Sequence, residues 1–125
     1  MLKKWVLLLS ACGMTIACYN PPRNCEDFKV GSFRYTDMID GKEQTTTFVR
    51  NTEIEIGTFE GRVDTSSIRW INDCEYVLRN LNPKSREEEK AILIKILSTT
   101  DSSYTFEFGQ VGSANKSRGT AIKMN

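Results

Sequence analysis

The segment from Ile68 to Leu78 constrains the fold most, because apolar residues recur there at every second position. Successive side chains of a β-strand point to opposite faces of the sheet, so residues of one parity share a face. The residues of this parity are Ile68, Trp70, Cys74, Tyr76 and Leu78. Asn72 and Asp73 interrupt the pattern, either as a tight turn between two strands or as a bulge that bends one long strand. In both cases the segment predicts a strand face that packs against the core.

Short alternating segments separated by turn residues fill the chain after Phe28, which is typical of an antiparallel all-β domain. Asp40 and Gly41 suit a hairpin turn, because both residue types tolerate positive φ. The expected strands cover about residues 31–35, 44–50, 54–56, 68–71, 74–81, 90–97, 104–108 and 119–124. The sequence predicts one domain over residues 25–125, an antiparallel meander of about seven or eight short strands that forms a small barrel or half-barrel.

Residues 85–97 fit two structures. Ser85 and Glu88 have the spacing of a capping box, which would begin a helix over residues 87–97. Ile92, Ile94 and Ile96 alternate strictly, and β-branched side chains favour a pleated strand. We expect a strand over about residues 90–97, after at most one helical turn.

The N-terminus carries the features of an export signal. Lys3 and Lys4 precede an apolar run over residues 5–17, which has the length of a secretory hydrophobic region and is too short to cross a membrane as a helix. The run ends in Thr15, Ile16, Ala17 and Cys18. This ending resembles the lipobox of bacterial lipoproteins, in which a small residue precedes a cysteine that is acylated and becomes the mature N-terminus.

Two cysteines compete for acylation. The sequence before Cys12 matches the lipobox better, but cleavage there would leave a very short hydrophobic region. Acylation of Cys18 would also leave Cys25 and Cys74 as an even pair. We therefore expect a signal peptide over residues 1–17, acylation at Cys18 with Cys12 as the alternative, and a proline-containing tether over residues 18–24.

Cys25 and Cys74 are expected to form a disulfide, because export brings the chain into an oxidising compartment. A metal-binding or reactive pair lacks the C-x-x-C spacing and any neighbouring histidine. The expected location is the bacterial cell envelope, with the lipid-anchored domain facing either the periplasm or the cell surface.

Composition argues against several function classes. The formal net charge is +1 and the basic residues are scattered, so no nucleic-acid partner is expected. The chain has no histidine, which removes the commonest general base and metal ligand, and we expect no metal, no cofactor and no catalytic residues. Glu53 and Glu55 have the spacing of a carboxylate pair, but we assign both to a solvated outer face of their strand.

Aromatic residues recur on the expected strands. We interpret them as core, or as the lining of a ligand cage, and favour core because about 100 residues is small for a barrel that also holds a guest. The residues so assigned are Phe33, Tyr35, Trp70, Tyr76, Tyr104 and Phe106.

Gly31, Ser32 and Phe33 form a glycine-x-aromatic motif at the start of a meander. This motif resembles the opening of the calycin group, which includes lipocalin-like barrels. The spacing from Cys25 through the segment 68–78 to the segment 104–108 is similar to that of a group of small Bacteroidota-type secreted or lipid-anchored proteins, from which no functional residues can be carried over. We expect a non-enzymatic binding module for a small apolar ligand or an envelope protein, with an assembly accessory of an envelope complex as the alternative.

Overall fold

The computed structural model describes residues 23–125. The expected signal peptide, both candidate acylation sites and most of the tether lie outside the described residues. Within residues 23–125, no helix combines the length and the apolar character that a membrane span requires.

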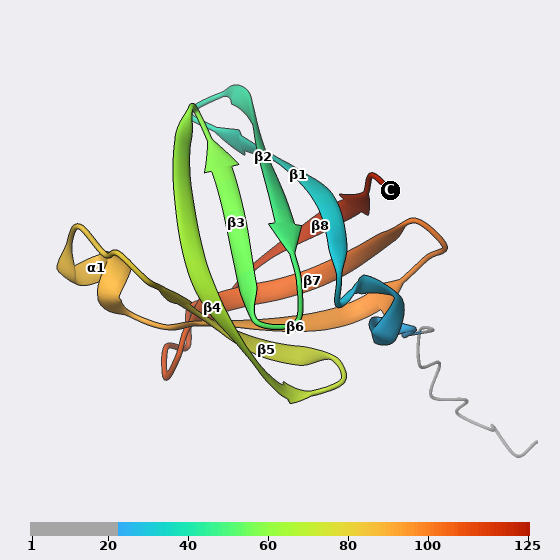
Figure 1. Ribbon diagram of the computed structural model, residues 1–125. Helices are drawn as coiled ribbons and strands as arrows, with labels where there is room; N and C mark the ends of the chain where they lie inside the picture. Colours follow the sequence, from blue (N-terminus) through green and yellow to red (C-terminus); the bar gives the residue numbers. More distant parts are fainter. Residues whose placement is uncertain (1–22) are drawn as a thin grey trace, which may run out of the picture.

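Eight strands form a closed barrel in which each strand pairs antiparallel with the next, and β8 returns to β1 (Figure 1). The strands are β1 (Gly31–Ile39), β2 (Lys42–Arg50), β3 (Ile54–Phe59), β4 (Arg62–Asn72), β5 (Glu75–Asn80), β6 (Ile92–Thr99), β7 (Ser103–Gln110) and β8 (Ser117–Lys123). The predicted all-β meander is confirmed, and it is a full barrel rather than a half-barrel. Its closure depends on a short contact, since β1 and β8 pair only from Phe33 to Tyr35 on β1.

The alternating segment from Ile68 to Leu78 belongs to the β4–β5 hairpin, in which Trp70 pairs with Tyr76. Both interpretations of its polar interruption hold in part. The register shifts between Trp70 and Asn72, which is a bulge, and the chain then turns. The Asn72 side chain stabilises that turn by accepting a hydrogen bond from the Cys74 backbone N–H at 2.9 Å. The predicted face is confirmed, because all five alternating residues belong to the core or pack against it.

The expected helical turn is a four-residue helix, α1 (Arg86–Glu89), whose N-terminus is capped by Ser85. The Ser85 hydroxyl accepts a hydrogen bond from the Glu88 backbone N–H at 3.2 Å. The isoleucine strand β6 follows and pairs with β7 as expected. β-branched alternation therefore prevails over the helical stripe after Lys90.

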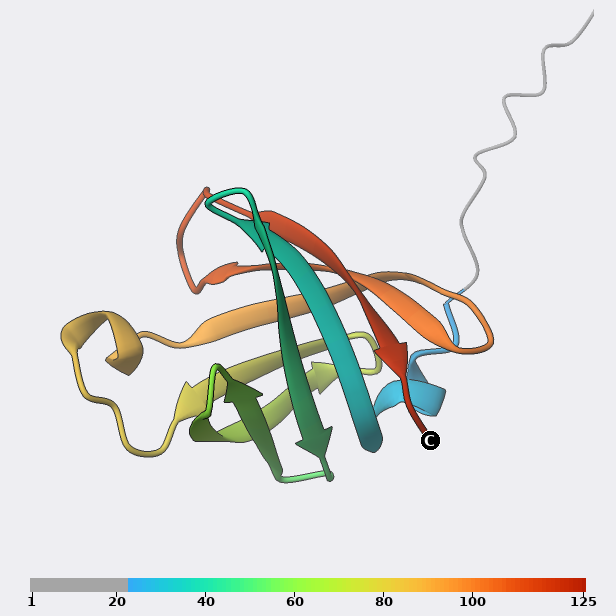
Figure 2. The ribbon, with the colours of Figure 1, turned by 90° about the horizontal axis from the view of Figure 1, so that it is seen from above.

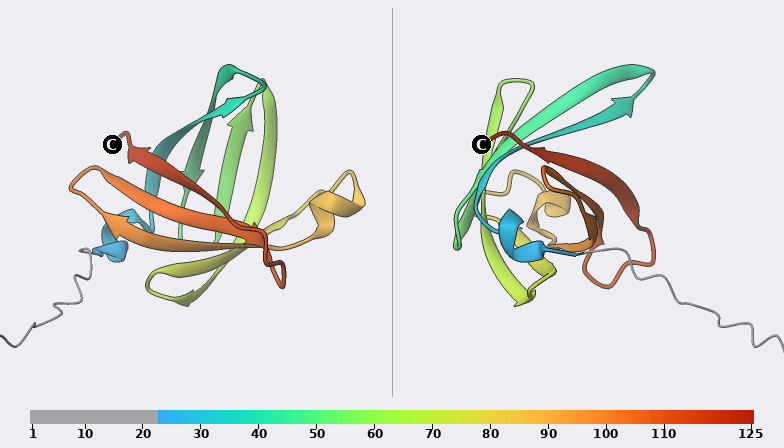
Figure 3. Two further views of the ribbon diagram at one scale, coloured as in Figure 1. Left: turned by 180° about the vertical axis from the view of Figure 1, so that it is seen from behind. Right: turned by 90° about the vertical axis from the view of Figure 1, so that its right-hand side faces the viewer.

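A 3-10 helix, η1 (Cys25–Phe28), lies across one end of the barrel (Figure 3). Its Phe28 ring is 1% exposed and packs on Phe33 and Tyr104. The Cys25–Cys74 disulfide joins η1 to the β4–β5 turn, which confirms the predicted bridge. We call this end the closed end.

The helix α1 lies on the other side of the molecule from η1 (Figure 2). The β1–β2, β3–β4 and β7–β8 turns belong to the same end as α1, which we call the open end. Beyond Tyr35, β1 has no pairing with β8, so the barrel wall is not continuous there.

Gly119 allows an aromatic ring to enter the interior between β1 and β8. A Cβ atom at this position would clash with the Tyr35 ring. The missing side chain therefore lets Tyr35 fold across β8 and stack edge-on against Phe106, with ring centroids 5.3 Å apart.

Candidate functional site

Arg50 is the unexpected residue of the barrel interior. It is 1% exposed, the single charged residue among the fully buried ones in residues 23–125. It lies two positions after Phe48 on β2, so strand alternation directs both side chains inward. A buried guanidinium remains charged at any physiological pH and must be compensated by its surroundings.

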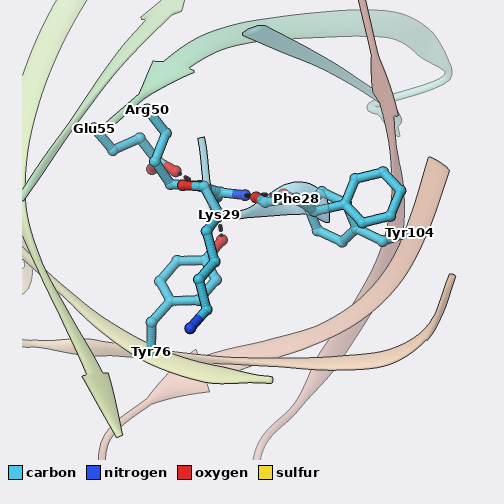
Figure 4. Close-up of polar contacts among 6 residues, drawn as sticks. All are labelled: Phe28, Lys29, Arg50, Glu55, Tyr76 and Tyr104. Atoms are coloured by element: carbon cyan, nitrogen blue, oxygen red, sulfur yellow. Dashed lines mark hydrogen bonds and ion pairs between the residues drawn. The ribbon is translucent and has the colours of Figure 1, made fainter. Parts of the chain in front are cut away.

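Every donor of the Arg50 guanidinium is used (Figure 4). Nε donates to the Lys29 carbonyl at 3.3 Å. Nη1 donates to Glu55 Oε1 at 3.1 Å and to the Tyr76 hydroxyl oxygen at 2.6 Å. Nη2 donates to the Phe28 carbonyl at 2.5 Å and to the Tyr104 hydroxyl oxygen at 3.3 Å. Since a guanidinium has five N–H groups, Arg50 has none left for another partner.

Arg50 also ties η1 to the barrel, because two of its acceptors are carbonyls at the end of that helix. Its Cζ atom lies 4.6 Å from the centre of the Phe33 ring and 4.9 Å from that of Tyr76. Such cation–π contacts add to the compensation of the buried charge. We call Arg50, Glu55, Tyr76 and Tyr104 the floor cluster.

Glu55 corrects the sequence interpretation. The sequence pattern predicts a solvated face for Glu55 together with Glu53, but the Glu55 side chain points inward and is 14% exposed. The physical reason is the register of β2 and β3, which pairs Glu55 with Arg50 and provides the buried cation with a counter-charge. The outward positions of β3 belong instead to Ile54 and Ile56, and Ile56 is exposed.

The protonation of the floor cluster follows from burial. Burial raises the pKa of Glu55, and the Arg50 guanidinium opposes this rise. Burial also raises the pKa of the Tyr76 and Tyr104 hydroxyls, so both remain protonated at physiological pH. The raised pKa of Arg50 keeps its charge fixed despite desolvation, because Tyr76, Tyr104 and Glu55 favour the cation.

An apolar pocket of about 220 Å³ opens inside the barrel above this cluster. Its polar members are Glu55 and three tyrosines, and the rest are apolar or aromatic. The lining residues are Tyr35, Phe48, Glu55, Tyr76, Leu78, Ile92, Ile94, Tyr104, Phe106 and Phe108. Burial raises the pKa of Tyr35 to about 12, so its hydroxyl is also neutral. We call this space the inner pocket.

A second hollow, of about 370 Å³, adjoins the inner pocket on the side of α1. The two share Leu78 and Ile92 and therefore meet at these side chains, on the side of the inner pocket that we take as its entrance. Charged groups surround this outer hollow, including Asp64, Glu87 and Glu88.

Two polar contacts hold α1 beside the outer hollow. Glu88 forms an ion pair with Arg62 at the start of β4, and Glu87 accepts a hydrogen bond from Gln110 at the end of β7, at 2.8 Å. The position of α1 at the entrance is therefore fixed by exposed polar side chains rather than by core packing.

The structure divides the six predicted aromatic residues between two roles. Tyr35, Tyr76, Tyr104 and Phe106 line the inner pocket. Phe33 is fully buried below it and stacks on Phe48. Trp70 packs on Tyr76, with ring centroids 4.5 Å apart, and is not among the lining residues.

Sequence reasoning missed Arg50 and Glu55. Parity offered a signal for Arg50, because Phe48 and Arg50 share a strand face. No comparable signal existed for Glu55, since its inward position depends on the pairing of β3 with β2.

Other chemistry has little support in the described chain. Among residues 23–125, no cluster of three or more histidine, cysteine or acidic side chains is arranged to hold a metal ion. A further hollow of about 520 Å³ lies outside the barrel beside the disulfide, and polar groups such as Arg23, Glu26 and Asp73 surround it.

Comparisons of the chain with protein-family models, curated proteins and solved structures found no match. They add no support to the calycin or Bacteroidota-type resemblance. The candidate site is therefore defined by its own geometry: an apolar barrel interior with a charged, hydrogen-bonded floor and an entrance beside α1.

Proposed function

We propose that this protein is a non-enzymatic binding module that holds a small apolar ligand in the inner pocket. The observation that carries the proposal is the lining of that pocket, where apolar and aromatic side chains converge above a few polar groups. Binding sites for small molecules commonly combine these features.

The volume sets the size of the ligand. Small-molecule pockets usually measure about 300–1,000 Å³, and an apolar cavity of about 150 Å³ can hold benzene. The inner pocket, at about 220 Å³, is below the usual range and suits a bicyclic ring system or a short chain. A longer ligand would extend past Leu78 and Ile92 into the outer hollow.

A cavity-filling variant tests the proposal. Leu78→Trp adds bulk at the junction of the two hollows, whereas Ile122→Trp adds the same ring on the exposed outer face of β8. Titration calorimetry with indene, an uncharged bicyclic probe, should show binding to the wild type and to Ile122→Trp, and at least about tenfold weaker binding to Leu78→Trp. Equal affinity of indene for all three proteins would overturn the proposal, as would a wild type that binds no uncharged bicyclic probe.

The disulfide indicates a non-reducing, exported environment. We further propose that acylation at Cys18 anchors the domain to the cell envelope, on either the periplasmic or the outer face. The tether would join the domain next to η1, so the closed end would face the membrane and the entrance would face away from it. Mass spectrometry of membrane-extracted protein should find a lipid on Cys18, and an unmodified Cys18 would contradict this.

Exposed apolar side chains favour the alternative, an accessory that docks an envelope protein. Several lie near the open end, where loops could meet a partner: Met38, Ile39, Val63, Leu81 and Val111. Under this alternative, Val63→Glu should abolish co-purification of an envelope protein without changing indene binding. Under the ligand-binding proposal, Val63→Glu should change neither the affinity for indene nor the co-purification of an envelope protein.

A further inference from the structure

We propose that the inner pocket selects a ligand whose apolar body ends in a neutral hydrogen-bond donor, which binds the free carboxylate oxygen of Glu55. This inference rests on the proposed function and specifies the chemistry of the ligand. It predicts that carboxylate ligands, including fatty acids, are rejected even though an arginine lies at the floor of the barrel.

Arg50 cannot serve as an anion receptor. Its five N–H groups are all directed to protein oxygens, two of them main-chain carbonyls of Phe28 and Lys29. A carboxylate ligand would have to displace one of these acceptors and leave it unpaired in the interior, which costs more than the new contact would return. The arginine is therefore a structural cation that organises the floor.

Glu55 is the charged acceptor of the floor cluster, and only one of its two carboxylate oxygens receives a hydrogen bond from the described residues. Its hydrogen bond from Arg50 goes to Oε1, and no described residue donates to Oε2. The side chain lines the inner pocket and keeps 14% of its surface exposed. A donor on the ligand would complete the coordination of this carboxylate, and hydrogen bonds to charged acceptors are among the stronger ones.

The outer hollow at the entrance also disfavours an anionic ligand. Asp64, Glu87 and Glu88 line the outer hollow, against the single cation Lys90 in that lining. Arg62 pairs with both Asp64 and Glu88, and Lys90 pairs with Glu87. Three carboxylates thus face two cations, and the remaining net negative charge is unfavourable for an anion. An anionic ligand would thus meet like charge on entry and a saturated arginine at the floor.

A cationic ligand is disfavoured for a different reason. Arg50 and Glu55 already form an ion pair at 3.1 Å, so the floor has no excess negative charge to repay the desolvation of an ammonium group. A neutral N–H or O–H group needs little desolvation and still gains the acceptor.

Bicyclic probes of matched shape test how the polar group of the ligand affects its affinity. Indole, benzofuran and indene have nearly the same shape, and only indole offers an N–H donor. Two charged probes, 2-aminoindane and indane-2-carboxylate, complete the series. Calorimetric titration of the wild type at about pH 8, well above the ordinary carboxyl pKa, should rank indole at least about tenfold tighter than every other probe.

Glu55→Gln tests the assignment to this side chain. The carboxamide oxygen can keep the bond from Arg50, and its NH₂ group then offers a donor to the pocket. The variant should lose the indole preference and bind benzofuran better than indole, whereas Glu53→Gln on the exposed loop should behave as the wild type. Thermal unfolding of both variants checks that each remains folded.

The outcomes separate the two proposals. Equal affinities for indole, indene and benzofuran would overturn the donor selectivity and leave the binding module intact. Tighter binding of indane-2-carboxylate or 2-aminoindane than of indole would also overturn it. Absence of binding by all five probes would overturn the proposed function, and the head-group inference with it.

Discussion

Arg50 shows how a single charged residue can organise a small barrel. Removing a guanidinium from water costs several kcal/mol, and the cost is recovered only when every donor is paired. Here the partners come from η1, β3, β5 and β7, so the residue joins segments that are distant in sequence. The same contacts leave the arginine without capacity for a ligand.

Replacing Arg50 by methionine should destabilise the protein by about 3–5 kcal/mol, because Glu55 would keep a buried charge without its partner. Urea unfolding measures this loss. Arg34→Met, on the exposed face of β1, serves as the matched control and should change stability by less than about 0.5 kcal/mol. Adding Glu55→Gln to Arg50→Met should recover part of the loss. Equal stabilities of Arg50→Met and Arg34→Met would contradict the role of the cluster.

The pKa of Glu55 provides a second prediction. A carboxyl whose folded pKa lies above its unfolded pKa binds more protons when folded. The contribution of Glu55 to the free energy of unfolding should therefore fall as pH rises from the ordinary carboxyl pKa through the raised one. The stability difference between wild type and Glu55→Gln across this pH range isolates the effect. A difference that grows in favour of the wild type as pH rises would show that the pKa is lowered instead.

The residues that sequence reasoning missed were the charged ones. The sequence pattern assigns Glu55 to the strand surface and gives Arg50 no role, because charged side chains are seldom fully buried. Each is inside because the other is there, and that mutual dependence is visible only once β2 and β3 are in register.

Local sequence patterns predicted the type of several strands and of the short helix. Short-range patterns were enough to predict three elements. These are the strands around the alternating residues from Ile68 to Leu78, the helical turn capped by Ser85, and the isoleucine strand β6. Strand ends were less predictable. β1 continues to Ile39 although its alternation fades after Tyr35, because Thr36 to Ile39 pair with β2 across the Asp40 and Gly41 turn.

The disulfide that links η1 to the β4–β5 turn should contribute strongly to the stability of the domain. The disulfide closes a loop with a sequence separation of 49 residues, for which the chain-entropy model gives a stabilisation of about 4 kcal/mol. The double variant Cys25→Ser/Cys74→Ser should unfold at correspondingly lower urea concentration. Reductant should shift the wild type toward the same midpoint and leave the variant unchanged. A wild-type midpoint that does not respond to complete reduction would contradict a stabilising role.

The molecule as a whole is a barrel with η1 at one end and α1 at the other (Figure 2). The outer hollow lies beside α1. The antiparallel order of the strands, and their number to within one, could be predicted from turn spacing. Full closure could not, because the β1–β8 contact joins the two ends of the domain through three residue pairs and has no local signature. The inner pocket likewise depends on packing, since the same aromatic residues could have filled the core completely.

Nuclear Overhauser effects in isotope-labelled protein locate bound indole and so test directly whether a ligand occupies the barrel interior. Binding in the inner pocket should give contacts from the indole ring to the methyl groups of Leu78, Ile92 and Ile94, with the indole N–H directed to Glu55. Contacts confined to exposed methyl groups, such as those of Met38 and Val63, would place the ligand on the surface and contradict a binding site inside the barrel.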